Sequence, residues 1–165
     1  MAEAMAERQE YQQHQQADQV LQWVTFQLDD ETYGINVMAV KEVLKFQDIA
    51  SVPGAAEDVM GIINIRGTVI SVINTRRRFG LPAREPDQST RIVILEVGEH
   101  VIGIVVDSVA EVVYLKQSQI EAPPQLSRDE GARFIQGVCH REGQLLILVE
   151  FDKLLTAEEL AELDN

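Results

Sequence analysis

The chain has 165 residues and a formal net charge of −13, with 45% hydrophobic and 25% charged residues. These values exclude a globally disordered chain, and the length suits one domain or two very small ones. Because nucleic acids and anionic membranes are themselves negative, the acidic balance argues against a general role on either. The single cysteine, Cys139, excludes an intramolecular disulfide framework and a cysteine-built zinc site.

Both ends of the chain are polar. Residues 1–19 are rich in Gln, Glu and Ala, which predicts a mobile or weakly helical tail. The capping box Thr156-x-x-Glu159 predicts a short acidic C-terminal helix over residues 156–165. The chain opens without the apolar stretch of a signal peptide, and its apolar runs are only strand-sized. We therefore expect a cytoplasmic protein that does not insert into a membrane.

Alternating apolar residues predict two β-hairpins in the first half. One spans residues 24–37 and turns at Asp29-Asp30. The other spans residues 62–73 and turns at Arg66-Gly67, where Gly67 can take the positive φ of a tight turn. Between them, the helical spacing of Val40, Val43 and Leu44 predicts one helical turn, and residues 55–60 are a candidate for another.

The second half is also predicted to be β-structure. Residues 80–90 contain two prolines and are the best candidate for a linker. Three further apolar segments read as strands, namely residues 91–97, 100–107 and 144–151.

The two halves resemble each other. Residues 33–44 lie over residues 102–113 with six identities in twelve positions, namely Gly34/Gly103, Ile35/Ile104, Val37/Val106, Val40/Val109, Glu42/Glu111 and Val43/Val112. A second pair matches Gly61 and Gly67 with Gly137 and Gly143. Chance similarity of valine-rich strands is the alternative. An internal duplication predicts two small β-subdomains, at about 20–85 and about 90–155, within one domain at about 20–160. The C-terminal segment could return to the first of them.

The sequence contains few residues that could form a catalytic, metal or nucleotide site. The neighbours Cys139 and His140 point to opposite faces of one strand, so they form a poor nucleophile–base pair, and Cys139 reads as a small core residue. The sequence contains no paired-histidine metal spacing and no glycine-rich nucleotide loop. We therefore expect no catalytic residues, no metal and no cofactor.

Six of the fourteen basic residues are arginines between positions 66 and 91. With Phe79 as the only nearby aromatic, a stacking platform for single-stranded nucleic acid is disfavoured. Residues 76–78 read as a solvated strand end. Arg66 lies at a hairpin tip, where it is either an ordinary exposed turn residue or a long donor that reaches a partner.

Four segments together resemble the CheW family of bacterial chemotaxis coupling proteins: YGINVMAVKEVLKF, GIINIRGTVISVINTR, HVIGIVVDSVAEVV and LLILVEFDKLL. The most specific part is the G-x-x-N-x-R-G pattern formed by Gly61, Asn64, Arg66 and Gly67. The resemblance covers about residues 20–160. It implies an all-β fold of two five-stranded Src-homology-3-like barrels packed on a shared hydrophobic core, with short helices.

The resemblance also implies a function. Family members are adaptors that link the cytoplasmic tips of methyl-accepting chemoreceptors to the histidine kinase CheA, through its regulatory domain, and other copies of the adaptor join them in rings. Neither catalysis nor a nucleic-acid partner is expected. The same scaffold in an array controlling pilus motility or another output is the alternative, and a small-barrel nucleic-acid binder is a remote one. Carried over by motif, the protein-binding residues are Ile35, Val40, Glu42, Gly61, Arg66 and Val112.

One stretch departs from the family. After the Arg-Gly turn the family commonly reads P-x-x-D-L-R, whereas this chain has Ser71, Asn74, Thr75 and Arg76 at those places. The missing aspartate removes a candidate partner for a nearby arginine, which puts the local geometry around Arg66 in doubt.

Overall fold

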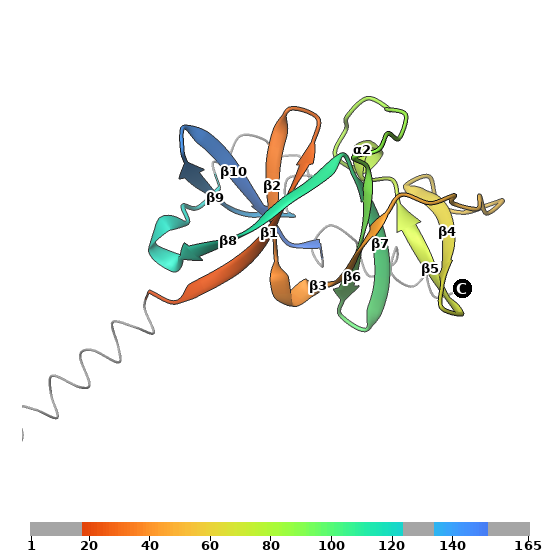
Figure 1. Cartoon of the computed structure of the whole chain (residues 1–165), viewed down its shortest axis with the longest axis horizontal. Helices are drawn as coiled ribbons and strands as arrows, with labels where there is room; N and C mark the ends of the chain where they lie inside the picture. Colours follow the sequence, from red (N-terminus) through yellow and green to blue (C-terminus); the bar gives the residue numbers. More distant parts are fainter. Residues whose placement is uncertain (1–17, 124–133, 152–165) are drawn as a thin grey trace, which may run out of the picture.

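The computed structural model describes residues 18–123 and 134–151, whose secondary structure is mostly β. The first sheet has the strand order β8-β1-β2-β10-β9 and contains β1 (Val20–Leu28), β2 (Glu31–Asn36), β8 (Ser108–Lys116), β9 (Ile135–Arg141) and β10 (Gln144–Val149). The second has the order β3-β6-β7-β5-β4 and contains β3 (Val40–Lys45), β4 (Val59–Ile65), β5 (Thr68–Ile73), β6 (Arg91–Val97) and β7 (His100–Val106). Figure 1 shows β9 and β10 at one end of the molecule, and β4 and β5 at the other.

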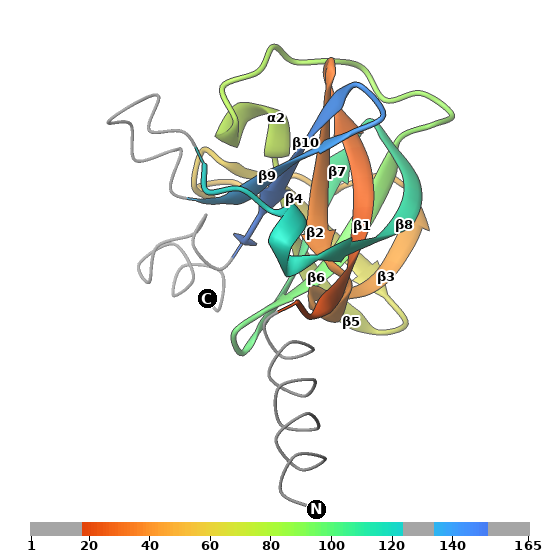
Figure 2. The same ribbon diagram turned by 90° about the vertical axis from the view of Figure 1, so that its left-hand side faces the viewer.

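Short helices complete the described part of the chain: η1 (Val37–Ala39), α2 (Thr75–Arg78) and η2 (Gln117–Gln119). Figure 2 shows α2 and the segment that follows it along one side of the molecule, at the top of the view. The all-β prediction with two five-stranded sheets and both hairpins is confirmed. The predicted tail over residues 1–17 and the C-terminal helix lie outside the described residues.

The duplication is visible in the sheets, but each sheet combines both halves. Strands β1 and β2 join β8, β9 and β10, and strands β6 and β7 join β3, β4 and β5. If β1–β5 are taken as equivalent, in order, to β6–β10, the two sheets have the same strand order. A cut in the 80–90 linker therefore does not separate the two sheets, because the chain changes sheet after β2 and again after β7. Parallel pairing of β10 with β2 brings the C-terminal strand back to the first hairpin.

The core has three parts because the central strands are buried on both faces. In β1, Trp23 packs in a hydrophobic cluster made by the first sheet alone. Val24, Phe26 and Leu28 instead face the shared core, which residues of both sheets form. Strand β6 does the same, with Ile92 and Ile94 inside the second sheet and its alternate residues in the shared cluster. Alternation thus buries apolar side chains on either side of one strand. The shared hydrophobic core holds the two sheets together.

Two predicted helical segments were wrong. Val40, Val43 and Leu44 lie on strand β3, and the helical turn in this region is η1, just before them. Residues 55–58 are irregular, and the next two residues begin β4.

Candidate functional site

Two of the expected binding residues form an ion pair. Arg66, at the tip of the β4–β5 hairpin, donates from Nη1 to Glu42 Oε1 at 3.1 Å and from Nη2 to Glu42 Oε2 at 2.6 Å. Glu42 lies on β3, the opposite edge strand of the same sheet. The pair therefore links the two edges of the second sheet, and it leaves the Arg66 side chain 73% exposed. The hydrogen bond from Arg66 holds the pKa of the Glu42 carboxyl below its usual value.

The hairpin tip has the geometry of a tight turn. Arg66 has φ of 50° and Gly67 has φ of 86°, the left-handed pair that suits a two-residue hairpin. Asn64 Oδ1 accepts a hydrogen bond from the Gly67 amide at 2.9 Å. The positive φ expected for Gly67 is confirmed, and the turn fixes where the Arg66 side chain begins.

Replacing Gly67 by valine is expected to lower the free energy of unfolding by about 1–2 kcal/mol, because a β-branched residue resists positive φ. The space around the position is open, so steric crowding adds nothing. Urea unfolding followed by circular dichroism measures the loss. Gly67→Asn is the control, since asparagine tolerates this conformation. Equal stability of the two variants would contradict the argument.

The second copy of the duplicated glutamate has a similar partner. Glu111 on β8 lies opposite Arg141 on β9, with Nη1 and Oε1 3.9 Å apart. Both glutamates therefore link the edge strands of their own sheets. In the first sheet the pair is looser, and the Glu111 side chain is 68% exposed. This recurrence gives the glutamate a structural role in addition to any role in binding.

Gly61 is a packing position. A Cβ there would lie 2.2 Å from the Ala50 carbonyl oxygen, because Ala50 and Ile62 exchange backbone hydrogen bonds across the outer edge of β4. The duplicated Gly137 is used in the same way, beside the bridge between Glu121 and Val138. Each glycine lets a passing segment cover the edge of its sheet, which limits pairing with foreign strands.

The three aliphatic residues expected at binding surfaces differ in exposure. Ile35 is only 2% exposed and belongs to the shared core, which corrects its expected place at a surface. Val40 is half-buried and packs against the same core. Val112 is 44% exposed on β8, and Tyr114, two residues further on the same face, is 65% exposed. The sequence reasoning missed Tyr114, although its two-residue spacing from Val112 was a usable signal.

The arginines around α2 are engaged by acids. Residues 76–78 form a short helix rather than a strand end, with Asn74 Oδ1 accepting from the Arg77 amide as its N-cap. Arg77 pairs with Glu57 at 2.9 Å, and Arg78 pairs with Asp58 at 2.9 Å. Asn74 at the family's usual Asp position therefore serves as a cap, and Arg66 has Glu42 as its partner.

Phe79 is not available for stacking on a ligand. Its ring lies 4.5 Å from that of Phe134 and 5.2 Å from that of Tyr33, measured between centroids. It thus packs against the shared core. Since Phe79 is packed and the arginines at 76–78 pair with acids, these residues do not form a stacking platform for single-stranded nucleic acid.

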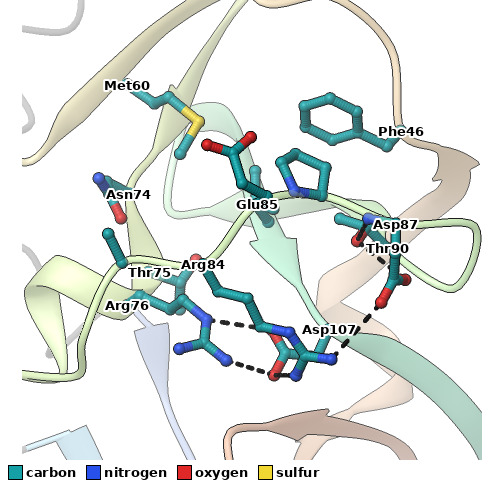
Figure 3. A pocket seen from close by; sticks show the side chains of 13 residues that line it. Phe46, Met60, Asn74, Thr75, Arg76, Arg84, Glu85, Asp87, Thr90 and Asp107 are labelled. Atoms are coloured by element: carbon teal, nitrogen blue, oxygen red, sulfur yellow. Dashed lines mark hydrogen bonds and ion pairs between the residues drawn. The ribbon is translucent and has the colours of Figure 1, made fainter.

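Asp107 joins three segments where the chain passes from β7 to β8, and Figure 3 shows its contacts with Arg76 and Arg84. Its carboxylate accepts from Arg76 Nη2 at 2.6 Å, from Arg84 Nη1 at 3.2 Å and from the Asp29 amide at 2.8 Å. Burial opposes ionisation, but the hydrogen bonds from Arg76 and Asp29 and the charges of both arginines outweigh it and hold the Asp107 pKa below its usual value. The Arg76 side chain is only 11% exposed. Removing its partner Asp107 would leave this buried charge without its closest carboxylate and lower the free energy of unfolding.

Asp107→Asn is expected to lower the free energy of unfolding by about 2 kcal/mol at pH 7, because it removes charged hydrogen bonds from Arg76. Since the folded pKa is lowered, the contribution of Asp107 is complete above the ordinary value of 3.8 and is lost as the pH falls through the folded value. Thermal unfolding from pH 7 to pH 2 should therefore show the two proteins converging in acid. Asp48→Asn, an exposed acid, is the control. A pH-independent difference would contradict this assignment.

The described residues support neither a metal site, nor a membrane-spanning helix, nor a reactive role for the thiol of Cys139. Within residues 18–123 and 134–151, the structure contains no group of His, Cys, Asp and Glu placed to hold a metal ion. Among the same residues, no helix has the length and apolarity needed to cross a membrane. Cys139 is 1% exposed, and burial raises the pKa of its thiol, which confirms that it is a core residue.

Comparison with known proteins agrees with this picture. Residues 22–159 match the family model described as "CheW-like domain". "Chemotaxis protein CheW" of Treponema pallidum (strain Nichols) is 38% identical over 152 residues, which cover 90% of this chain and 89% of that protein. The chain belongs to the CheW family. Members of the CheW family are non-catalytic scaffolding and adaptor proteins of chemotaxis, and this chain is one of them.

Two further similarities extend the comparison. The crystal structure of the scaffolding protein TtCheW from Thermoanaerobacter tengcongensis superposes with a TM-score of 0.76 and 32% identity, over 84% of this chain and 90% of that one. The two sheets therefore correspond to the two Src-homology-3-like units of the CheW fold. "Protein FrzA" of Myxococcus xanthus is 29% identical over 82% of this chain and 86% of that protein.

Proposed function

We propose that this chain couples methyl-accepting chemoreceptors to the histidine kinase CheA in the cytoplasm. In this role it contacts the receptor tips and the regulatory domain of the kinase, and other copies of the chain take part in the same array. It reaches the membrane only through these protein contacts. The observation that carries the proposal is Arg66, a largely exposed guanidinium held at a rigid hairpin tip by Glu42.

The two sheets supply different kinds of surface for two partners. On the second sheet, Arg66 and Glu42 form a charged patch that joins the hairpin tip to β3. On the first sheet, Val112 and Tyr114 leave apolar surface exposed on β8. A receptor tip is a helical hairpin, and helices dock by burying an apolar face in a groove. We therefore assign the β8 surface to the receptor and the hairpin to the kinase.

The experiment is kinase autophosphorylation in membranes that contain receptor and CheA, with and without this protein. Marked receptor-dependent stimulation supports the proposal. Val112→Asp should reduce both stimulation and receptor binding, whereas Val52→Asp, at a similarly exposed loop valine, should leave them unchanged. No stimulation, together with binding to neither receptor nor kinase, would overturn it.

A second candidate is the same adaptor role in an array with another output, such as pilus motility. The similarity to FrzA, whose name differs from that of the other relatives, is the observation that favours it. Deleting the gene and measuring swimming and surface motility separately would distinguish the two outputs.

A further inference from the structure

A cleft of about 350 Å³ lies where the segment after α2 crosses the second sheet (Figure 3). Strands β4 and β7 contribute Met60 and Val105, Phe46 follows the end of β3, and the crossing segment contributes Glu85 and Pro86. Its size is at the lower end of the ~300–1,000 Å³ range of small-ligand sites, which suits one side chain rather than a helix. It is distinct from the Arg66 hairpin and from the β8 surface.

The guanidinium groups in the cleft are already occupied. Arg76 donates to Asp107 and to the Pro82 carbonyl, and Arg84 donates to Asp107 at 3.2 Å and to Asp87 at 3.5 Å. Three carboxylates line the cleft against these two cations. An anionic ligand would therefore meet excess negative charge and no free guanidinium.

Glu85 is the third carboxylate of the cleft, and unlike Asp87 and Asp107 it does not pair with Arg76 or Arg84. Within the described part of the chain it has no hydrogen bond or ion pair, and it is exposed. In Figure 3 its side chain points away from the two arginines and toward Met60. A negative group thus shares the cleft with an aromatic ring and a thioether.

We propose that this cleft binds a basic side chain, arginine or lysine, that projects from a protein partner. The aliphatic stem packs against Phe46, Met60 and Pro86, and the charged head pairs with Glu85. A cation beside Phe46 gains further attraction from the face of the ring. Long basic side chains have this combination of apolar stem and charged head. The net charge of −13 also draws basic surfaces toward the protein.

The test uses N-acetyl-arginine methylamide, titrated into the full-length, ¹⁵N-labelled protein and followed by NMR. Its citrulline counterpart has nearly the same shape without the charge. We expect saturable shifts of the Phe46, Met60 and Glu85 amides with the arginine compound, at a Kd on the order of 10 mM for so small a ligand. The citrulline compound should bind at least about fivefold more weakly.

Two variants locate the binding. Glu85→Gln should weaken the arginine compound by about fivefold, whereas Glu99→Gln, an exposed acid in the β6–β7 turn, should leave the affinity unchanged. Equal binding of the two compounds, shifts centred elsewhere, or an unaffected Glu85→Gln would each overturn the proposal. The assay contains neither kinase nor receptor, so its outcome is independent of the coupling role.

Discussion

Gly61→Ala is expected to destabilise the protein by about 3 kcal/mol. The added Cβ would meet the backbone of Ala50 at 2.2 Å, and a backbone atom cannot move aside as the end of a side chain can. Relief requires the segment before β4 to withdraw, which breaks the paired hydrogen bonds between Ala50 and Ile62, both 2.9 Å long. Urea unfolding should show the loss, and hydrogen exchange at the Ile62 amide should quicken more than elsewhere.

Two other glycines provide a graded control. Gly137→Ala brings its Cβ to 2.9 Å from the Glu121 carbonyl oxygen and to 2.6 Å from a methyl group of Ile120, so its cost should be smaller. Gly98→Ala meets no atom within 4 Å and carries only the cost of its positive φ, about 1–2 kcal/mol. A cost at Gly61 no greater than that at Gly98 would mean that the edge segment rearranges freely.

The hairpins could be predicted because their signals are local. Alternation and turn residues stand within a few positions of each other, and both turns fell where Asp29-Asp30 and Arg66-Gly67 indicated. The exchange of strands between the halves could not be predicted in this way. The partners in β10 and β2 are far apart in the chain, and nothing in the duplicated pattern says which copy a strand joins.

The false helical turn at Val40 has a specific cause. The pairing of β3 with β6 shifts between Val40 and Glu42, so Val40 faces Leu95 and Val43 faces Val93. Paired residues project to the same side of a sheet, and both partners belong to the shared core. The bulge therefore puts residues three apart on one face, which is also the spacing of a helix. The pairing of β1 with β8 shifts in the same way, between Val24 and Phe26.

The candidate site was only partly predictable from residue types. Arg66 and Glu42 were both identified from the family motif, but their contact joins two edge strands and needs the sheet to be known. Ile35 was misplaced because alternation shows that one face of a strand is buried and does not reveal that the other face is buried as well. Asp107 was missed for a similar reason, since its partners come from α2, the linker and the first turn.

Arg66→Ala is expected to reduce receptor-dependent kinase stimulation by about tenfold or more, if the guanidinium is an anchor of the kinase contact. The folded state should persist, because Arg66 is largely exposed and the Glu42 carboxylate that remains is partly exposed to water. Circular dichroism and a thermal melt check this, and kinase binding is measured on the same samples. Val69→Ala, at an exposed residue near the same turn, is the control.

A charge exchange separates the structural and binding roles of the pair. Glu42→Arg combined with Arg66→Glu can rebuild the link between β3 and the hairpin, since the two side chains still face each other with opposite charges. If the pair acts only by closing the sheet, the exchanged protein should recover both melting temperature and kinase stimulation. If Arg66 touches the kinase, stability should recover and stimulation should not, because the charge presented at the hairpin tip is reversed. We expect the second result, and full recovery of stimulation would assign the pair to the fold alone.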